Sequence, residues 1–490
     1  MLAGVAFTAC SDDAITNDGM TMQEALAPSE YAIELDADAS NLTAKAAIKS
    51  DQGSFKTEDL GVFMLAMNKI NTTLTPFWGF DQNQDCSWYR DPKQTKDSKT
   101  YGYTYGFVAY IDNMPATASP KSAADPAQGS KIMLKNGEAE RYPVGSFHRY
   151  NFYAYTPRAE KIEYKKDSVV AVMTNLNGTQ DVIYSAAIPG DENNTVQEAY
   201  KDYAWSANYF RFRQNRDDAT DMPKANKNPK FHFTHKMMQL MFNVQPGGLD
   251  ADGKPVAEDK KEDNLNYDPA LETEIIGISI VNIPDTIRLV VADRSGMNNG
   301  DLTYSSDNRT QEWFLKSYVA KKSTTGTTYY ADQVMPAQSL AMVQEQAIDE
   351  EGNPMVDADG NPIMVNTNTP VVTKLGGPDA VHRQGMIVPA ISKEDRLKPD
   401  GCYMAKVVVK YPKSSEDAKY YEMNVPLDSD PQNPEKQFKP GSSYEIYLRI
   451  YGPNTVTATS QEREWHEVDI EDLRKGGNYD VPAEEETNNP

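Results

Sequence analysis

Apolar and polar residues alternate along much of the chain, in short runs separated by turn-forming residues. Between residues 238 and 244, every even position is apolar and lies opposite the polar Gln239 and Asn243. A period of two is typical of β-strands with one buried face. Comparable runs lie at 101–107, 147–155, 276–291, 406–411 and 444–450. The pattern predicts an all-β fold of β-sandwiches with long loops and few short helices.

The body of the chain divides into two halves of about equal length. Residues 214–229 are polar and basic and have no periodicity, which suits a boundary. We therefore expect an N-terminal β-sandwich over residues 45–222 and a C-terminal β-sandwich over residues 229–475. Each half is long for one sandwich, so long loops or insertions are expected.

One insertion is visible at residues 344–378. Within it, the stretch 349–356 is followed by a near-copy at 357–365, and each copy places Gly-Asn-Pro after acidic residues. That order of residues is typical of turns. At the far end of the chain, residues 476–490 are acidic, and we expect a disordered tail there.

The first ten residues are short, apolar and end in small residues before Cys10. This looks like the remnant of a bacterial lipoprotein signal, in which the cysteine becomes lipidated. Phe7 replaces the usual leucine, and no basic stretch precedes it, so a chance cysteine in an ordinary apolar N-terminus is the alternative. A lipid on Cys10 would tether an otherwise soluble acidic protein to a membrane.

Residues 11–44 form a polar leader that contains one strand-like run. Tyr31, Ile33 and Leu35 share one face of this run, and Glu34 and Asp36 lie on the other. A polar stretch rich in small residues follows and resembles a flexible connector. The leader therefore contains a single strand candidate, separated from the rest of the first half.

Charge and cysteine content exclude several classes of protein. The chain has 49 basic and 72 acidic residues, which gives a net charge of −23 and makes nucleic acid an unlikely partner. No apolar run approaches the roughly 20 residues that span a bilayer. Three cysteines do not make a disulfide framework. Cys86 and Cys402 either form one long-range bridge or remain separate buried thiols.

The chain offers little for metal binding or catalysis. His232 and His235 are the only close pair of histidines, and a spacing of three on a strand places them on opposite faces. Asp250 and Asp357 each begin a short acidic turn that lacks the later ligands of a calcium loop. No nucleophile elbow, zinc-protease motif, phosphate loop or dinucleotide fingerprint is present. We expect no metal, no cofactor and no enzyme.

The order of motifs resembles the fimbrillin family, the lipid-anchored pilins and adhesin-like lipoproteins of the type V pilus. The resemblance spans about residues 45–470. It rests on the lipoprotein-like start and on segments 55–63, 148–157, 202–207, 231–236, 438–441 and 444–451, with a late Trp465. The resemblance implies two transthyretin-like (immunoglobulin-like) β-sandwich domains.

The resemblance also implies a mechanism of assembly. In such pilins a protease removes an N-terminal strand, and an extended strand of the next subunit fills the open groove. Here the removable strand would be Tyr31–Ala37. The first arginine of the chain is Arg90, so Lys45 and Lys49 are the processing candidates in the connector. The alternative is that Tyr31–Ala37 is a permanent edge strand.

At the other end of the chain, residues 455–459 and 465–470 are candidate donor strands. Equally, they could form a final strand that completes its own domain. A sandwich that lacks an edge strand exposes backbone donors and acceptors along an apolar trench, and a donated strand would satisfy both.

The expected function is therefore that of a fimbrial structural subunit or a surface adhesin, on the cell outer membrane and in the fimbrium. Its partners would be other fimbrial subunits, the outer membrane through a lipid anchor, and host or microbial surface ligands. The alternative is a surface glycan-binding lipoprotein, with Trp78, Trp88 and Tyr89 as candidate contacts. Those rings could equally pack in the core.

Overall fold

The computed structural model defines a fold made almost entirely of β-strands. It describes residues 27–38, 57–70, 73–76, 109–122, 124–125, 128–135, 140–144, 149–165, 168–174, 176–196, 204–214, 228–257, 264–293, 296–304, 309–315, 319–322, 329–331, 337–350, 352–375, 385–390, 403–427 and 438–463. Within these ranges the only helices are α2 (Ala207–Gln214) and α3 (Asp268–Leu271). The predicted all-β class is confirmed. None of the described helices has the length and apolar character needed to cross a membrane.

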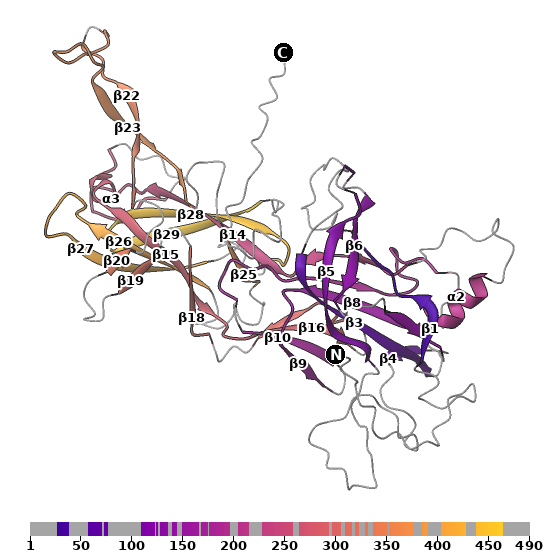
Figure 1. Ribbon diagram of the computed structural model, residues 1–490. Helices are drawn as coiled ribbons and strands as arrows, with labels where there is room; N and C mark the ends of the chain where they lie inside the picture. Colours follow the sequence, from indigo (N-terminus) through magenta and orange to yellow (C-terminus); the bar gives the residue numbers. More distant parts are fainter. Residues whose placement is uncertain are drawn as a thin grey trace.

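The largest sheet has nine strands and lies at the indigo and magenta end of the molecule (Figure 1). Its order is β12-β2-β6-β5-β3-β8-β11-β13, with β4 paired to the end of β3. Its strands are β2 (Leu35–Asp38), β3 (Thr57–Ile70), β4 (Thr73–Pro76), β5 (Ala109–Pro120), β6 (Ser130–Leu134), β8 (Tyr150–Thr156), β11 (Ile183–Ala187), β12 (Lys230–His232) and β13 (Thr234–His235). Neighbouring strands are antiparallel except β2 and β12, which are parallel.

This sheet curls until its two edges approach each other. The end strands β12 and β13 follow one another in the chain with only Phe233 between them, so the sheet cannot remain open and flat. The curl encloses a core and removes most of the free edge, as closure does in a β-barrel. Tyr209 and Phe210 of helix α2 pack into the same core. Members of this core include Leu35, Leu60, Val62, Phe152, Ile183, Trp205 and Phe231.

Residues 60–65 of β3 and the whole of β8 are buried on both faces. Val62 and Met64 point into the core inside the curl, whereas Phe63 belongs to a second core on the other side. A four-stranded sheet covers that side, in the order β17-β16-β10-β9. Its strands are β9 (Lys161–Tyr164), β10 (Ser168–Met173), β16 (Ile287–Asp293) and β17 (Leu302–Tyr304).

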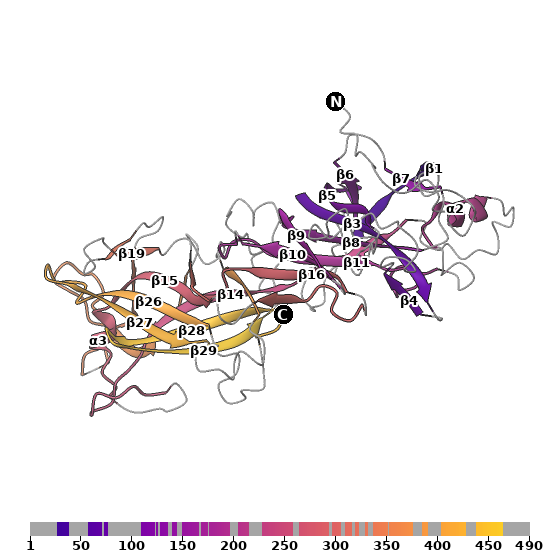
Figure 2. The same cartoon turned by 90° about the horizontal axis from the view of Figure 1, so that it is seen from below.

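The two halves of the chain exchange strands across the expected boundary at residues 222–229. Strands β12 and β13 follow this boundary but complete the first sheet. Strands β16 and β17 come from the second half but pair with β10 of the first half. Figure 2 shows β9, β10 and β16 lying between the nine-stranded sheet and the C-terminal part. The exchange joins the two parts through continuous sheet and core.

The C-terminal part is a β-sandwich of two five-stranded sheets. One contains β14 (Met237–Pro246), β24 (Thr373–Lys374), β25 (Met386–Pro389), β28 (Ser443–Gly452) and β29 (Thr455–Arg463). The other contains β15 (Glu274–Ile283), β18 (Gln311–Phe314), β21 (Gln338–Ser339), β26 (Met404–Tyr411) and β27 (Lys419–Pro426). Leu240 of β14, Ile278 of β15, Val407 of β26 and Ile446 of β28 share the core between the sheets.

Three pairs of strands lie outside these sheets. They are β1 (Pro28–Ala32) with β7 (Arg141–Pro143), β19 (Ala320–Lys322) with β20 (Tyr329–Ala331), and β22 (Met342–Gln346) with β23 (Met364–Pro370). The pair β22–β23 lies in the insertion expected at 344–378 and projects from the C-terminal sandwich in Figure 1.

The leader run predicted as one strand is two strands. The chain leaves the strand conformation at residues 33–34, so that β1 pairs with β7 and β2 pairs with β6 and β12. The expectation of one continuous strand over Tyr31–Ala37 was therefore wrong. The period of two survives the break, because Ser29, Tyr31, Leu35 and Ala37 are all buried.

Candidate strand-exchange groove

The leader contributes an internal strand to the nine-stranded sheet. β2 pairs antiparallel with β6, where Leu35 lies opposite Ile132, and parallel with β12, where Ala37 lies opposite Phe231. The Asp36 N–H donates to the carbonyl of Pro229 at 3.0 Å, and the Phe233 N–H donates to the carbonyl of Asp38 at 3.2 Å. β2 is therefore neither a free strand nor an edge strand, because it bridges two strands that do not otherwise meet.

The apolar face of the leader fills the core inside the curl. Tyr31 stacks on Phe210 of α2 with 5.6 Å between ring centroids. Leu35 and Ala37 are each 1% exposed, and the half-buried Ile33 packs against the same core. Complete burial of a side chain the size of leucine contributes about 1.5–3 kcal/mol. The groove that holds this segment is therefore an apolar trench with separate positions for an aromatic, a branched and a small residue.

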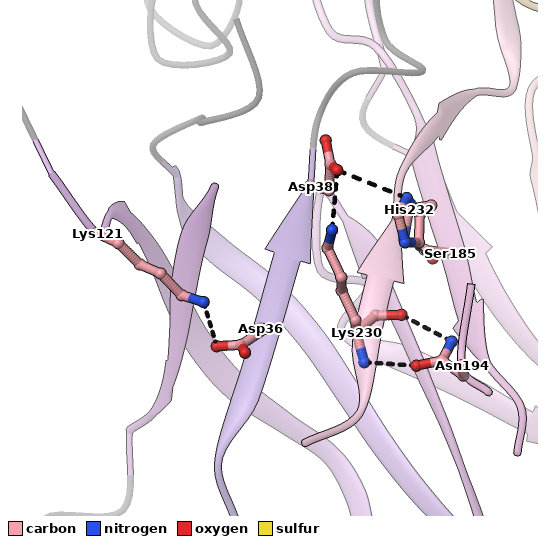
Figure 3. Close-up of polar contacts among 7 residues, drawn as sticks. All are labelled: Asp36, Asp38, Lys121, Ser185, Asn194, Lys230 and His232. Carbon is pink, nitrogen blue, oxygen red and sulfur yellow. Dashed lines mark hydrogen bonds and ion pairs between the residues drawn. The ribbon is translucent and has the colours of Figure 1, made fainter. Parts of the chain in front are cut away.

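The opposite face of β2 carries carboxylates that lie against lysines (Figure 3). Asp36 pairs with Lys121 at 2.8 Å, and Asp38 pairs with Lys230 at 3.1 Å. All four side chains are between 20% and 35% exposed, so water screens these pairs and each contributes only about 0.2–1 kcal/mol. Their main effect is to favour an acidic residue at every second position of the strand in the groove.

Strand β12 is short and is held on its far side by side chains. The Lys230 N–H donates to Asn194 Oδ1 at 2.8 Å, and Asn194 Nδ2 donates back to the carbonyl of Lys230 at 3.0 Å. The His232 N–H donates to Ser185 Oγ of β11 at 2.8 Å. Figure 3 shows these bonds on the side of β12 away from β2. We call this contact of β12 with Ser185 and Asn194 the seam of the sheet.

A histidine lies where the seam meets β2. Nδ1 of His232 lies 3.9 Å from a carboxylate oxygen of Asp38, and its Nε2 is buried without a hydrogen-bond partner. Burial, followed by the positive charge of Lys230, lowers the pKa of His232 from its ordinary value of 6.5. The carboxylates of Asp38, Asp191 and Glu192 act in the opposite direction. The net effect favours the neutral imidazole in the folded chain.

This arrangement can bind an extended strand. Without the leader, β6 and β12 would present unpaired backbone groups on either side of an apolar trench, and an added strand would satisfy both. The described residues contain no group of three or more His, Cys, Asp or Glu that could hold a metal ion. Two residues that the sequence analysis considered for metal binding have other partners. His235 hydrogen-bonds with buried Asp181, and Asp357 accepts backbone N–H groups of its own turn.

Several sequence-predicted site residues lie outside the described ranges. They are Cys10, Lys45, Lys49, Trp78, Trp88 and Tyr89, together with Cys86, Cys402 and the 476–490 tail. Tyr31, Ile33 and Leu35 are described and share the groove. Of the candidate donors, residues 455–459 belong to β29, which pairs with β28 of its own sandwich, and 465–470 lie outside the described ranges.

Sequence reasoning missed the polar partners of the groove. Lys121, Asn194 and Lys230 carry no local signal, because the chain has 49 basic residues and the contacts span long separations. Asp38 and Lys230 lie 192 positions apart. The only available signal was the alternation of acidic residues in the leader, which implies basic partners without identifying them.

No family model and no curated protein matches the chain. Solved structures do match. A candidate cell adhesion protein from Bacteroides uniformis has 14% identity and a TM-score of 0.35, over 90% of this chain and 100% of that chain. The fimbrial anchor protein Mfa2 from Porphyromonas gingivalis has 8% identity and a TM-score of 0.28, over 90% and 98% of the two chains.

The tip fimbrial protein Mfa3 from Porphyromonas gingivalis, with a C-terminal truncation, has 7% identity and a TM-score of 0.31, over 88% and 99% of the two chains. All three structures have TM-scores below 0.5. Because their TM-scores are low, the case for function depends on the geometry of this chain.

Proposed function

We propose that this chain is a fimbrial structural subunit or a fimbrillin-like surface adhesin that joins its neighbours by strand addition. One observation carries the proposal: a short N-terminal segment forms an internal strand of its sheet, between β6 and β12. In sequence, residues 39–56 separate this segment from β3, so that one cut would detach it. A removable internal strand is what a strand-accepting subunit needs, because its loss opens a groove.

The groove selects its occupant by pattern. Alternate positions of the strand face the trench, where Leu35 and Ala37 now lie, and the positions between them face Lys121 and Lys230. The preferred occupant therefore alternates apolar and acidic residues. In this chain, residues 467–471 read Glu-Val-Asp-Ile-Glu, the same alternation as Glu34-Leu-Asp-Ala-Asp38. We propose this segment of a second copy, or a similar segment of an accessory subunit, as the donor.

Processing and location complete the proposal. A cut after Lys45 or Lys49 would release the leader strand, and a lipid on Cys10 would hold the unprocessed chain at the outer membrane. The processed chain would then lie in the fimbrium, joined to other subunits. Each contact is heterologous, because one copy donates at its C-terminus and the next accepts at its groove, so that growth gives a filament.

The test uses the full chain with a recognition site for a sequence-specific protease introduced between Lys45 and Lys49. After cleavage, a fluorescent peptide of residues 28–38 is added, and its uptake is followed by fluorescence polarisation. We expect the cleaved chain to exchange its own strand for the peptide, whereas the uncleaved chain does not. A peptide of residues 464–473 is tested in competition.

The matched control is the same 28–38 peptide carrying Leu35→Asp. It keeps the backbone and the acidic face but places a charge in the trench, so its uptake is expected to be lost. If the cleaved chain neither releases residues 28–38 nor takes up the unmodified peptide, even at raised temperature, the strand is permanent and the proposal fails.

A further inference from the structure

The backbone groups of β12 point alternately to its two sides, because successive residues of a strand hydrogen-bond in opposite directions. On the side of the groove, the carbonyl of Pro229 accepts the N–H of Asp36 at 3.0 Å. On the other side lie the N–H and the carbonyl of Lys230 and the N–H of His232. One set of backbone groups therefore bonds to the leader, and the other set bonds across the seam.

The partners across the seam are side chains. Asn194 Oδ1 accepts the N–H of Lys230 at 2.8 Å, and Asn194 Nδ2 donates to the carbonyl of Lys230 at 3.0 Å. Ser185 Oγ accepts the N–H of His232 at 2.8 Å. A primary amide carries an acceptor and a donor side by side, as a peptide group of a neighbouring strand does. The side chain of Asn194 therefore takes the place of a strand at Lys230 (Figure 3).

The segment that carries these side chains is fixed without help from the leader. Ser185 lies in β11, which pairs with β8. In the loop after β11, the N–H of Asn194 donates to Asp191 Oδ1 at 2.6 Å, and the N–H of Gly190 donates to the carbonyl of Asn194 at 2.8 Å. Asn194 itself is 0% exposed. The bonds that hold the loop therefore persist when β2 is absent.

The apolar side chains next to these bonds hold β12 in a different way. Phe231 and Phe233 are each 0% exposed and lie in the core inside the curl, with 5.9 Å between their ring centroids. Apolar burial is not directional, whereas a hydrogen bond depends on the angle of its donor. Phe231 and Phe233 therefore keep β12 on the core, and the bonds across the seam orient its backbone.

We propose that Asn194 and Ser185 are positioning residues for strand addition, which hold β12 as a wall of the groove while the groove is empty. This rests on the function proposed above and names the residues that prepare its groove. With Lys230 and His232 bonded across the seam, the carbonyl of Pro229 stays directed at the incoming strand. That strand runs parallel to β12 and antiparallel to β6, as β2 does. A wall already in place lowers the ordering cost of binding.

The first test needs no strand exchange and uses the full, uncleaved chain. Asp36→Pro removes the N–H that bonds to Pro229 and disfavours β2 as an internal strand. Amide hydrogen exchange of residues 228–235 is measured by mass spectrometry. We expect exchange to stay slow in Asp36→Pro and to become about tenfold faster when Asn194→Ala is added. Asn194→Ala alone is expected to have a much smaller effect, because β2 then still holds β12.

The comparison of backgrounds separates positioning from a general loss of stability. An equal effect of Asn194→Ala with and without Asp36→Pro overturns the proposal, and so does no effect in either background. Exchange in β8 reports whether the rest of the sheet stays folded. Leu35→Ala is a milder way to weaken β2 and replaces Asp36→Pro if β8 also loses its protection.

The second test uses the cleaved chain and the fluorescent peptide of residues 28–38. Asn194→Ala, which removes two hydrogen bonds, is expected to lower the affinity for the peptide about tenfold. Ser185→Ala, which removes one, is expected to lower it about threefold, and Ser185→Thr, which keeps the hydroxyl, is expected to restore it. The matched control is Thr195→Ala, at an exposed position of the same loop, which is expected to leave the affinity unchanged.

The two tests distinguish failure of this inference from failure of the proposed function. If the unmodified cleaved chain takes up no peptide, strand addition is wrong, and the hydrogen-exchange comparison still decides whether Asn194 holds β12. If the unmodified chain and Asn194→Ala take up the peptide with equal affinity, strand addition stands and the positioning role of Asn194 is overturned.

Discussion

At the scale of single residues, the leader strand combines two kinds of recognition in alternate side chains. Leu35 and Ala37 enter the core. On the opposite face, Asp36 pairs with Lys121, which follows β5, and Asp38 pairs with Lys230 of β12. The apolar positions supply most of the binding energy, because burial contributes more than partly exposed ion pairs do. The carboxylates contribute mainly to register, since a shift of one residue would place them in the trench.

Leu35→Ala is expected to lower the free energy of unfolding by about 2–4 kcal/mol, because it removes methyl groups from a site that is 1% exposed. Urea titration of the uncleaved chain measures this. The matched control is Glu34→Ala at the neighbouring exposed position, which is expected to change the free energy by less than about 0.5 kcal/mol. Equal effects of the two substitutions would mean that the strand does not bury Leu35.

Acidification is expected to weaken the seam through His232. Because its pKa is lowered in the folded chain, the unfolded chain takes up a proton first as the pH falls through 6.5. The stability contributed by the neutral imidazole is thus fully present above pH 6.5 and is lost as the pH falls below it. Urea titrations at about pH 7.5 and about pH 5.5 measure this.

The variant His232→Gln isolates this contribution, because other groups also titrate over the same range. We expect the unmodified chain to lose more stability on acidification than the variant does. A difference between the two proteins that stays constant with pH would show that His232 does not titrate on unfolding.

At the scale of elements, the sequence pattern predicted strands well and their partners poorly. The runs at 238–244 and 444–450 lie within β14 and β28, and the turn at 284–286 separates β15 from β16. These successes reflect local period-two patterns. The parallel pairing of β2 with β12 depends on residues nearly 200 positions apart, and β15 and β16 enter different sheets. No local pattern encodes such choices, because they depend on how the whole sheet curls.

The sequence pattern also underestimated how many polar side chains are buried in a central strand such as β14. The alternation places Gln239 and Asn243 opposite the apolar face of their run, yet each is only 1% exposed in β14. Their side chains bond across to β28, Gln239 with Ser443 and Asn243 with Glu445. A polar residue in an alternating run therefore indicates a face that is hydrogen-bonded, which need not be an exposed face.

The tip of the β22–β23 hairpin, residues 347–363, is expected to be dispensable for folding. Replacing residues 347–363 with Asn-Gly would join Gln346 to Met364, which already lie opposite each other in the hairpin, through a two-residue turn. Because none of the described residues of the tip is buried, the free energy of unfolding is expected to change by less than about 1 kcal/mol. Urea titration checks this, and a loss of cooperative unfolding would show that the tip supports the sandwich.

At the scale of the whole molecule, β2 joins β6 to β12 in the nine-stranded sheet. Without β2, this sheet would have an open edge. The curl brings β12 next to β11, and in the part of the chain that the structure describes, three hydrogen bonds across the seam involve the side chains of Ser185 and Asn194. Loss of β2 would therefore expose β6 and leave β12 attached at the seam. The same strand, β2, therefore fills the groove and stabilises the first half of the chain.

The proposed strand exchange between copies is expected to be faster at higher salt. Each copy has a net charge of −23, and an incoming donor strand with acidic residues approaches a like-charged body. Screening at higher ionic strength, where the Debye length falls from about 10 Å at 0.1 M to about 3 Å at 1 M, should therefore speed strand exchange in the cleaved chain.

The measurement is the initial rate of assembly of the cleaved chain across a salt series, and this rate is expected to rise with salt. A rate that falls as salt is added would show that attraction of the donor's carboxylates to Lys121 and Lys230 outweighs the repulsion between acidic copies, and the prediction would then be wrong.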